Sequence, residues 1–253
     1  MSKYCSFPYF NFLFPDRFFS PYLREKPLFS NVDLYKVNFK FETSINYPPK
    51  VEFIYRDENI LINGNFLSAQ VDLEKKVIYC NFPQKKLFWE LFFYPFASLS
   101  YYYPFFLLHA SSGVKKGRGY LFVGESGAGK STALSTFGLK KINEDRSVVG
   151  VKGNLILNPF EQYVIYPEMV QVPLKAIFFL KGKDKNQLLR IDNKEEVLYL
   201  LFSNFLFFSR QLKYKGKMME WLNNFVFSRE IEYYYLSYLK SESKEWFWNE
   251  IQN

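Results

Sequence analysis

The sequence predicts an α/β domain built on a mixed sheet and preceded by a β-rich N-terminal subdomain. Strand and turn signals dominate the first third of the chain, whereas buried-strand and helical patterns alternate in the rest. A glycine-rich segment also joins a short apolar run to a helical segment near the middle. With 253 residues the chain can bury a sizeable core. We place a soft boundary near Lys85, between a β-rich subdomain over residues 1–85 and an α/β domain over residues 86–253.

The N-terminal subdomain is predicted from four short patterns. The stretch YKVNFKFE, from Tyr35, alternates polar and apolar residues, and VEFIYR, from Val51, has the β-branched and aromatic content of a strand. The dipeptide Asn63-Gly64 is a hairpin-turn signal, and VDLEKKVIYC adds a second hairpin that turns at residues 74–76. These patterns predict strands joined by tight turns.

The segment Phe88–Leu108 raises the question of membrane contact, because its 21 residues carry no basic side chain. Glu90 and Pro95 interrupt the apolar run, and Pro104 should break any helix there. We therefore predict a buried helix followed by a buried strand. A segment that lies on a membrane surface is the alternative.

The elements of the α/β domain follow from hydrophobic periodicity. The runs FFLLHAS, GYLFVG and KAIFFLKG are typical of buried strands, and IEYYYLSYL is a further strand. The segments KSTALSTFGLK, NKEEVLYLLFSNFLFFSRQL and KMMEWLNNFVFSR have helical patterns. The closing stretch SKEWFWNEIQ predicts a last helix, for which Ser243 is the candidate N-cap.

The formal net charge of +8 favours anionic ligands. The lysines are spread along the chain, however, without the basic runs that bind nucleic acid, so we expect no nucleic-acid partner. Aromatic residues reach 21%, with 30 Phe and 20 Tyr. We attribute this excess to AT-rich coding DNA, which favours Phe, Tyr, Lys, Asn and Ile together, and an aromatic binding surface is the alternative.

The two cysteines, Cys5 and Cys80, have neither metal-ligand spacing nor a disulfide framework. Free thiols of this kind suit a reducing cytosol. The apolar N-terminus is interrupted by Pro8, Pro15 and Asp16 and lacks a small-residue cleavage site, so it is not a signal peptide. We expect a cytoplasmic protein with no membrane partner.

The glycine-rich segment matches the phosphate-loop pattern G-x-x-x-x-G-K-[ST] throughout. Glycines allow successive backbone N–H groups to turn inward and form an anion-binding nest, to which the following helix adds its N-terminal partial charge. The alternative is a glycine turn with a solvated lysine. The candidate nucleotide-binding residues are Gly124, Glu125, Ser126, Gly127, Ala128, Gly129, Lys130, Ser131 and Thr132.

Two of these side chains have predicted roles of their own. Lys130 would bridge the β- and γ-phosphates of the nucleotide as a point charge. Ser131 would ligate Mg²⁺ through its hydroxyl. Because ATPases, GTPases, kinases and transporters share this loop, the residues around it must decide the reaction.

The stretch KKINEDRSVVG supplies the candidate carboxylates. Asp145 lies 14 residues beyond Ser131, after a short buried segment, and could hold Mg²⁺. Glu144 could take a proton from an attacking hydroxyl. A solvated charge cluster at a turn is the alternative. His109, the only histidine, ends an apolar run, where a structural role is the ordinary interpretation.

Taken together, these segments resemble the HPr kinase/phosphorylase superfamily. The motif LHAS with His109, then Gly124 fifteen residues later opening GESGAGKST, then INEDRSVV and VPLKAIFFLKG, is similar to its smaller kinase-like members, which are related in fold to phosphoenolpyruvate carboxykinase. The resemblance covers residues 108–181 most clearly. Outside that range, the final YYYLSYLKSESKEWFWNEI is similar to the closing strand and helix of the family.

The resemblance implies an ATP- and Mg²⁺-dependent kinase that acts on a serine hydroxyl of a protein, peptide or small metabolite. It assigns phosphate and metal to Lys130 and Ser131, the metal-side carboxylate to Asp145 and the acidic base to Glu144. His109 takes the place of the active-site histidine. By the same resemblance, Arg146 follows the acidic pair, where it would contact phosphate or the carboxylates, and a homo-oligomer is implied by hexameric relatives.

The sequence departs from the family pattern in three ways. Its first acid is Glu144 rather than Asp, the link from loop helix to acidic pair is shorter, and no Gly-Thr-Pro-Trp type segment is recognisable in residues 153–173. These departures leave a second interpretation open. The chain could instead be a degenerate kinase fold that binds a nucleotide to stabilise a partner-docking surface and transfers no phosphate.

Overall fold

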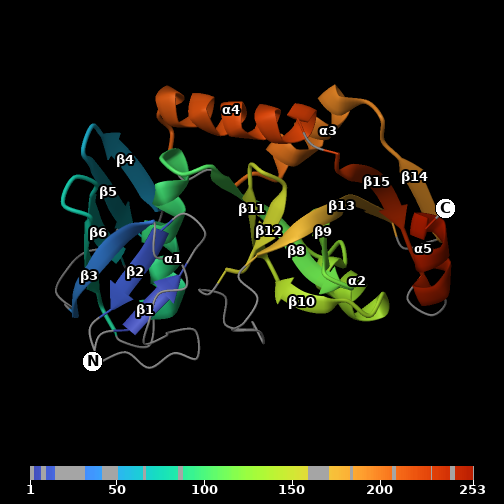
Figure 1. The fold of residues 1–253 in the computed structure, drawn as a ribbon, viewed down its shortest axis with the longest axis horizontal. Coiled ribbons are helices and arrows are strands. Elements are labelled where there is room, and N and C mark those ends of the chain that lie inside the picture. Colours follow the sequence, from blue (N-terminus) through green and yellow to red (C-terminus); the bar gives the residue numbers. More distant parts are fainter. Residues whose placement is uncertain are drawn as a thin grey trace. The chain divides into compact units, whose positions relative to one another are not determined.

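The structure is a computed structural model that describes residues 3–6, 10–14, 32–41, 51–64, 67–84, 88–158, 171–182, 185–206, 209–228, 230–239 and 243–252. Its backbone is mixed α/β, with more strand than helix, two mixed sheets and five α-helices among the described residues (Figure 1). The chain divides into two compact units. The first comprises Met1–Tyr103 and Phe207–Met218, and the second comprises Pro104–Leu206 and Met219–Asn253.

The first unit contains a seven-stranded sheet whose order is β1-β2-β3-β7-β6-β5-β4. Its middle pairs, β2 with β3 and β3 with β7, are parallel, and the others are antiparallel. The strands are β1 (Lys3–Ser6), β2 (Phe10–Phe14), β3 (Asp33–Phe41), β4 (Glu52–Arg56), β5 (Asn59–Gly64), β6 (Leu67–Asp72) and β7 (Val77–Phe82).

One face of this sheet packs against helix α1 (Phe88–Ser98). The alternation of β7 places Ile78, Cys80 and Phe82 on the buried face, because successive side chains of a strand point to opposite sides. Phe92 and Phe96 of α1 are fully buried. The thiol of Cys80 is free, and burial raises its pKa well above the ordinary value.

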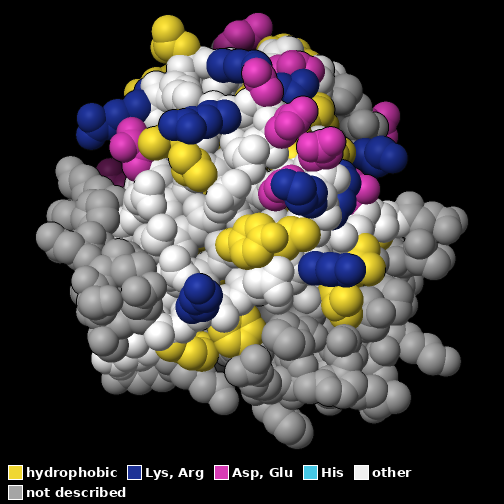
Figure 2. All heavy atoms as spheres, turned by 90° about the vertical axis from the view of Figure 1, so that its left-hand side faces the viewer, with side chains coloured by type: hydrophobic (Ala, Val, Ile, Leu, Met, Phe, Trp, Pro, Cys, Tyr) yellow, Lys and Arg dark blue, Asp and Glu magenta, His cyan; other side chains and the backbone are white. Residues whose placement is uncertain are grey.

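The opposite face of the sheet carries the exposed side chains. Tyr79 is 48% exposed there, between the buried Ile78 and Cys80. Figure 2 shows the side of the molecule that bears these strands, where Lys and Arg side chains are interspersed with Asp and Glu side chains in the upper part. Among the coloured residues this face therefore offers no continuous basic stripe.

The second unit contains the eight-stranded sheet, ordered β10-β8-β11-β12-β13-β15-β14, with β9 paired to both β8 and β13. Most of its pairs are antiparallel, but β13 pairs in parallel with both β9 and β15. The strands are β8 (Phe105–Lys115), β9 (Arg118–Val123), β10 (Lys140–Asn143), β11 (Arg146–Gly150), β12 (Asn154–Ile156), β13 (Gln171–Gly182), β14 (Gln187–Arg190) and β15 (Glu232–Ser237).

Two long strands give this sheet its form. β8 pairs with β11 along its first half and with β9 along its second half. β13 pairs first with β12 and then with β9. Successive pairing from β8 through β11, β12, β13 and β9 therefore leads back to β8. This pairing places the carboxyl end of β9 next to the middle of β8.

Four of the described helices follow β9 in the sequence: α2 (Lys130–Thr136), α3 (Lys194–Ser203), α4 (Leu212–Ser228) and α5 (Ser243–Gln252). The division between the units falls within α4, at Met218. A buried aromatic cluster joins α2 and α5 to the sheet, with Phe122 from β9, Phe178 from β13, Phe137 at the end of α2 and Phe247 from α5. This cluster fixes the segment between β9 and α2.

Most of the predicted elements are confirmed. The strand predictions at Tyr35 and Val51 correspond to β3 and β4, and the predicted turn at residues 74–76 joins β6 to β7. Phe88–Leu108 forms a helix and the first part of a buried strand, as predicted. Asn63-Gly64 ends β5 of the predicted hairpin, whose connecting residues 65–66 lie outside the described part of the chain.

Three helix predictions are wrong in extent. The helix predicted over residues 130–140 ends at Thr136, and Lys140 begins β10. The pattern of residues 193–212 predicts one helix, but α3 ends at Ser203 and the following residues pair with β8. Helix α4 begins at Leu212, five residues before the predicted start. Ser243 begins α5 where a cap was predicted, and its side chain lies outside the described part. The predicted boundary at Lys85 also lies outside the described residues and stays a prediction.

No helix within the described ranges is both long and apolar enough to cross a membrane.

Candidate functional site

The segment Gly124–Gly129 forms an exposed loop between the carboxyl end of β9 and the first turn of α2. Gly127 and Gly129 have φ angles of +79° and +99°, in the left-handed region where side chains other than glycine are strained. Residues 125–128 make a tight turn, in which the backbone N–H of Ala128 donates to the carbonyl of Glu125 at 3.1 Å. The strand, loop and helix thus follow one another in the order that the motif requires.

Lys130 lies under this loop. Its side chain is buried, and its ammonium donates to the carbonyl oxygens of Gly124 at 2.8 Å and Glu125 at 3.0 Å. Loss of solvent lowers the pKa of Lys130 below its ordinary 10.5, although nearby Asp145 acts in the opposite direction. An anion bound in the loop would compensate for the solvent that the ammonium has lost.

The two ends of α2 are held by hydrogen bonds from the C-terminal part of the chain. Tyr238 donates its hydroxyl proton to the carbonyl of Gly129 at 2.8 Å, and burial raises the pKa of Tyr238 to about 12. Trp248 Nε1 donates to the carbonyl of Phe137 at 2.9 Å, and Phe137 stacks on Phe247 with ring centroids 3.8 Å apart. α2 has only seven residues, so its dipole is small, and the loop amides and Lys130 must provide most of the attraction for an anion.

His109 connects the lysine to the acidic pair. It lies on β8 directly opposite Arg146 on β11, and its Nε2 is 2.8 Å from Asp145 Oδ1. The same nitrogen is 3.3 Å from the ammonium of Lys130. A single ring nitrogen cannot both donate to the carboxylate and accept from the lysine. We assign the proton on Nε2 to the shorter contact, so that His109 fixes the carboxylate of Asp145 beside Lys130.

The hydroxyl of Ser111 links Ser131 to the backbone of Glu144. Ser111 of β8 donates to the carbonyl of Glu144, and its oxygen lies 3.3 Å from the hydroxyl oxygen of Ser131. The carboxylate of Glu144 pairs with Lys141 at 2.9 Å. The backbone at Glu144 is thus tied to the start of α2, whereas its side chain is engaged by a lysine of β10.

The turn that presents the acidic pair is fixed by a buried amide. Asn143 is fully buried at the end of β10, where the ladder with β8 is irregular. Its Nδ2 donates to the carbonyl of Ile156 at 3.0 Å, and its Oδ1 accepts from the N–H of Asn158 at 2.8 Å. Because each of these partners is buried, the amide cannot move without losing a hydrogen bond. The sequence analysis did not single out Asn143.

The donor atoms near the loop fit Mg²⁺. The hydroxyl of Ser131 and the carboxylate of Asp145 are hard oxygen ligands, and Mg²⁺ bound with a nucleotide needs only one or two protein ligands besides phosphate and water. Within the described ranges no three acidic, histidine or cysteine side chains gather as a ready-made metal site. Ser131 and Asp145 thus carry the type of oxygen donor that Mg²⁺ prefers.

A cavity of about 740 Å³ opens beside the loop. Its size is typical of small-molecule sites. The backbone N–H of His109 donates to the backbone carbonyl of Asn204, one of the residues that line the cavity, at 2.8 Å. One wall is the predicted segment Gly124–Ala128. The other walls were not predicted from the sequence: Val123, Phe179–Gly182 at the end of β13, and Tyr199, Leu200, Ser203 and Asn204 at the end of α3.

The structure brings most of the predicted site residues into one region of the second unit. His109 contacts both Lys130 and Asp145, and Ser111 links the hydroxyl of Ser131 to the backbone of Glu144. Thr132 belongs to the first turn of α2 and is half-buried. Arg146 is placed by its pairing with His109. The roles assigned to these residues stay predictions.

No model of a known protein family matches the chain, and no curated protein is significantly similar to it.

Proposed function

We propose that the protein is an ATP- and Mg²⁺-dependent phosphotransferase of the HPr kinase-like class, which transfers phosphate to a serine hydroxyl of a protein, peptide or metabolite. The observation that carries the proposal is the contact of Lys130, under the glycine loop, with His109, which in turn binds Asp145. A loop that only held a nucleotide would not need a histidine–carboxylate pair against its lysine. The mixed sheet with strand, loop and helix in succession is compatible with the related phosphoenolpyruvate carboxykinase-like fold.

The donor nucleotide would lie along the loop. Backbone N–H groups of Gly124–Gly129 and the ammonium of Lys130 would receive the β- and γ-phosphates. The nucleoside would occupy the adjoining cavity, where Tyr199 offers an aromatic face and Asn204 an amide. Tyr199→Ala should therefore weaken binding of ATP but not of inorganic tripolyphosphate, and equal weakening of both would reject this placement.

Ser131 and Asp145 would hold the metal, which neutralises charge on the phosphates when bound. His109 would position the carboxylate of Asp145 through Nε2. The role of Lys130 is to hold the transferring phosphoryl group as its charge spreads in the transition state.

The transfer itself needs a proton acceptor. The serine oxygen attacks the γ-phosphorus, the bond from that phosphorus to the β–γ bridging oxygen breaks, and ADP leaves with the electron pair. We assign the serine proton to the carboxylate of Glu144, which is partly exposed and lies next to Asp145. For this, Lys141 must release or share the carboxylate, because the two are paired at 2.9 Å.

The test is to incubate the protein with γ-labelled ATP and a cell lysate, and to identify any molecule that gains label. Glu144→Gln should lower transfer about a hundredfold or more and leave nucleotide affinity unchanged, because a general base acts on the chemical step alone. Lys141→Gln, which frees the carboxylate, should retain transfer. Equal transfer by Glu144→Gln and the wild type would reject the assignment of the base.

A second candidate function is supported by the Lys141–Glu144 pair. If this pair is permanent, the chain lacks a free base and binds nucleotide only to stabilise a docking surface for a partner. This function requires nucleotide binding that Lys130→Ala abolishes, without transfer of label to any acceptor. A labelled acceptor in the wild type would exclude it.

A further inference from the structure

A second cavity of about 740 Å³ lies at the other end of β9 from the glycine loop. Its walls are the turn between β8 and β9, Lys175 of β13, and one face of α5. Tyr120 lines this cavity and Val123 lines the cavity beside the loop; the two residues lie roughly 10 Å apart along β9, and the cavities share no lining residue. This cavity therefore cannot belong to the nucleotide loop.

The cavity is strongly basic. Five of its ten lining residues are cationic and one, Glu245, is acidic; the cations are Lys115, Lys116, Arg118, Lys175 and Lys244. Lys175 is paired with Glu232. Among the residues that the structure describes, no carboxylate lies within ion-pair distance of the other four cations. The fold thus places like charges near one another, and an anion bound among them would reduce their mutual repulsion.

The turn between β8 and β9 is built to place three of these cations. Lys115 pairs with Arg118, and the two residues between them, Lys116 and Gly117, have φ angles of +48° and +72°. Two positive φ angles are the mark of the tight type I′ hairpin turn. A lysine is an uncommon choice for such a position, because its Cβ strains the left-handed backbone. Despite this strain, Lys116 occupies the tip of the turn and places a cation there.

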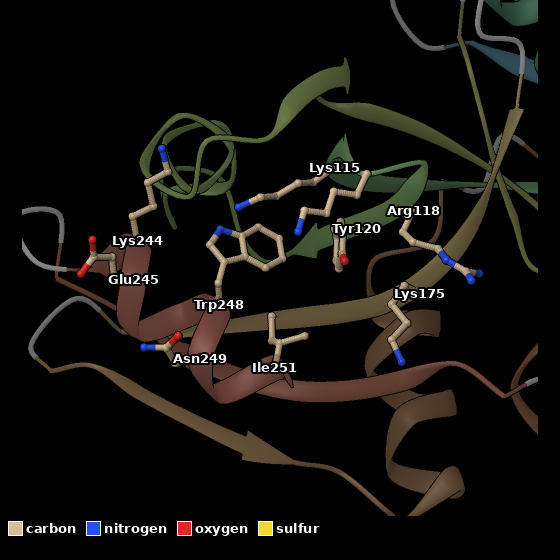
Figure 3. A pocket seen from close by; sticks show the side chains of 10 residues that line it. Lys115, Arg118, Tyr120, Lys175, Lys244, Glu245, Trp248, Asn249 and Ile251 are labelled. Atoms are coloured by element: carbon tan, nitrogen blue, oxygen red, sulfur yellow. The ribbon is translucent and has the colours of Figure 1, made fainter. Parts of the chain in front are cut away.

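Trp248 forms the floor of the cavity. Figure 3 shows the indole in the middle, with Lys244 and Glu245 on one side and Arg118 and Lys175 on the other. The ammonium of Lys115 lies over the indole at 3.7 Å from its centroid. Burial, and then repulsion by Lys244 and Lys116, lower the pKa of Lys115. An anion in the cavity would offset both effects.

We propose that this cavity, with Lys115, Lys116, Arg118 and Lys244 around Trp248, binds a compact small molecule that carries several phosphate groups. A cavity of this size suits a small ligand. Single-stranded nucleic acid is disfavoured, because stacking of a base requires an open aromatic face and Lys115 covers that of Trp248. An acidic peptide is disfavoured because β9 is paired on both sides and offers no free edge for an added strand.

A ligand in this cavity would also affect the nucleotide loop, through Trp248 and α2. Trp248 donates to the carbonyl of Phe137, the residue that ends α2, and α2 begins with Lys130. A ligand that fixes Trp248 would therefore steady the far end of the helix that carries the loop residues.

The test is calorimetric titration of the full chain with phytate, a compact polyphosphate that serves as the probe. Arg118→Gln/Lys244→Gln removes one exposed cation from each side of Trp248 and should weaken binding about tenfold or more. The matched control, Lys36→Gln/Lys152→Gln, removes the same charge from exposed positions elsewhere and should leave binding unchanged. Circular dichroism of both variants verifies that they fold.

Three results would overturn the proposal. The first is failure of the wild type to bind phytate, and the second is equal weakening in the control variant, which would mean that net charge alone attracts the probe. The third is loss of phytate binding in Lys130→Ala, which would place the probe in the glycine loop. A single-stranded oligonucleotide or a polyglutamate peptide that binds more tightly than phytate, and loses its affinity in Arg118→Gln/Lys244→Gln, would reject the small-molecule class.

Discussion

Lys130 combines burial with positive charge, and this combination makes it sensitive to whatever occupies the loop. Its ammonium has two carbonyl partners, Gly124 and Glu125, and neither carries a full negative charge. The pKa of Lys130 is lowered because burial makes the charged ammonium less stable than it is in water. A polyphosphate would supply the missing negative charge and raise the pKa again.

This coupling predicts that nucleotide affinity falls as pH rises through the lowered pKa of Lys130, which lies below 10.5. Only the charged form of Lys130 binds phosphate, so bound nucleotide raises the pKa of this lysine. At a pH between the pKa of Lys130 in the free protein and its pKa in the complex, the complex holds more protons, and binding therefore takes up protons. Calorimetry in two buffers of different ionisation enthalpy, from pH 7 to 10, measures this uptake. Affinity that is constant over the range would contradict the role of Lys130.

For single residues, the sequence predicted the course of the backbone better than the partners of the side chains. The glycine and lysine spacing predicted the loop between β9 and α2, because those residue types are needed for that turn. It could not predict that Glu144 pairs with Lys141 while Asp145 pairs with His109. That choice depends on the irregular ladder between β10 and β8, which is a tertiary feature.

Among the elements, α5 has the largest effect on the site although it contributes no predicted site residue. Phe247 is fully buried against Phe137, and Trp248 caps the end of α2. The helix therefore supports the loop from behind. Its pattern was visible in the sequence as a closing helix, but its packing partner was not.

Phe247→Ala should lower the free energy of unfolding by about 3–5 kcal/mol, because the change leaves a cavity in the aromatic cluster. Phe227→Ala is the matched control: Phe227 is 50% exposed on α4, and its loss should change stability by no more than about 0.5 kcal/mol. Urea denaturation followed by circular dichroism compares the two. Similar losses for both variants would show that the cluster does not fix α5.

The elements that the sequence analysis missed share a physical cause. β12 and β14 have three and four residues, too few to show a period. β2 is recognised only through its parallel pairing with β3, about twenty residues further along the chain. α3 ends at Ser203 although the apolar pattern continues, because Leu206 donates to the carbonyl of Leu107 and extends the sheet instead. Long-range pairing overrides local propensity for β2 and at the end of α3.

At the scale of the whole molecule, the residues proposed for catalysis all belong to the second unit, between Pro104 and Leu206. The first unit has its own sheet and its own buried face. The two units are therefore expected to differ in their response to nucleotide.

Hydrogen exchange with and without Mg²⁺-ATP should show this difference. Slower exchange is expected in the amides of residues 107–111, 124–132 and 143–147, because bound phosphate orders the loop and the strands that meet it. The amides of residues 33–41 and 67–82, in the first unit, should exchange at the same rate in both conditions. Protection confined to the first unit would contradict the proposed site.

Every proposed role at this site requires that the loop at Gly124–Gly129 and Lys130 bind the phosphates of a magnesium nucleotide. Calorimetric titration of the full chain with Mg²⁺-ATP tests it directly, with Lys152→Ala, an exposed lysine of the β11–β12 turn, as the control. We predict one binding site in the wild type and in Lys152→Ala, and affinity lower by about tenfold to a hundredfold in Lys130→Ala. No binding by the wild type, or equal affinity in Lys130→Ala, would contradict the claim.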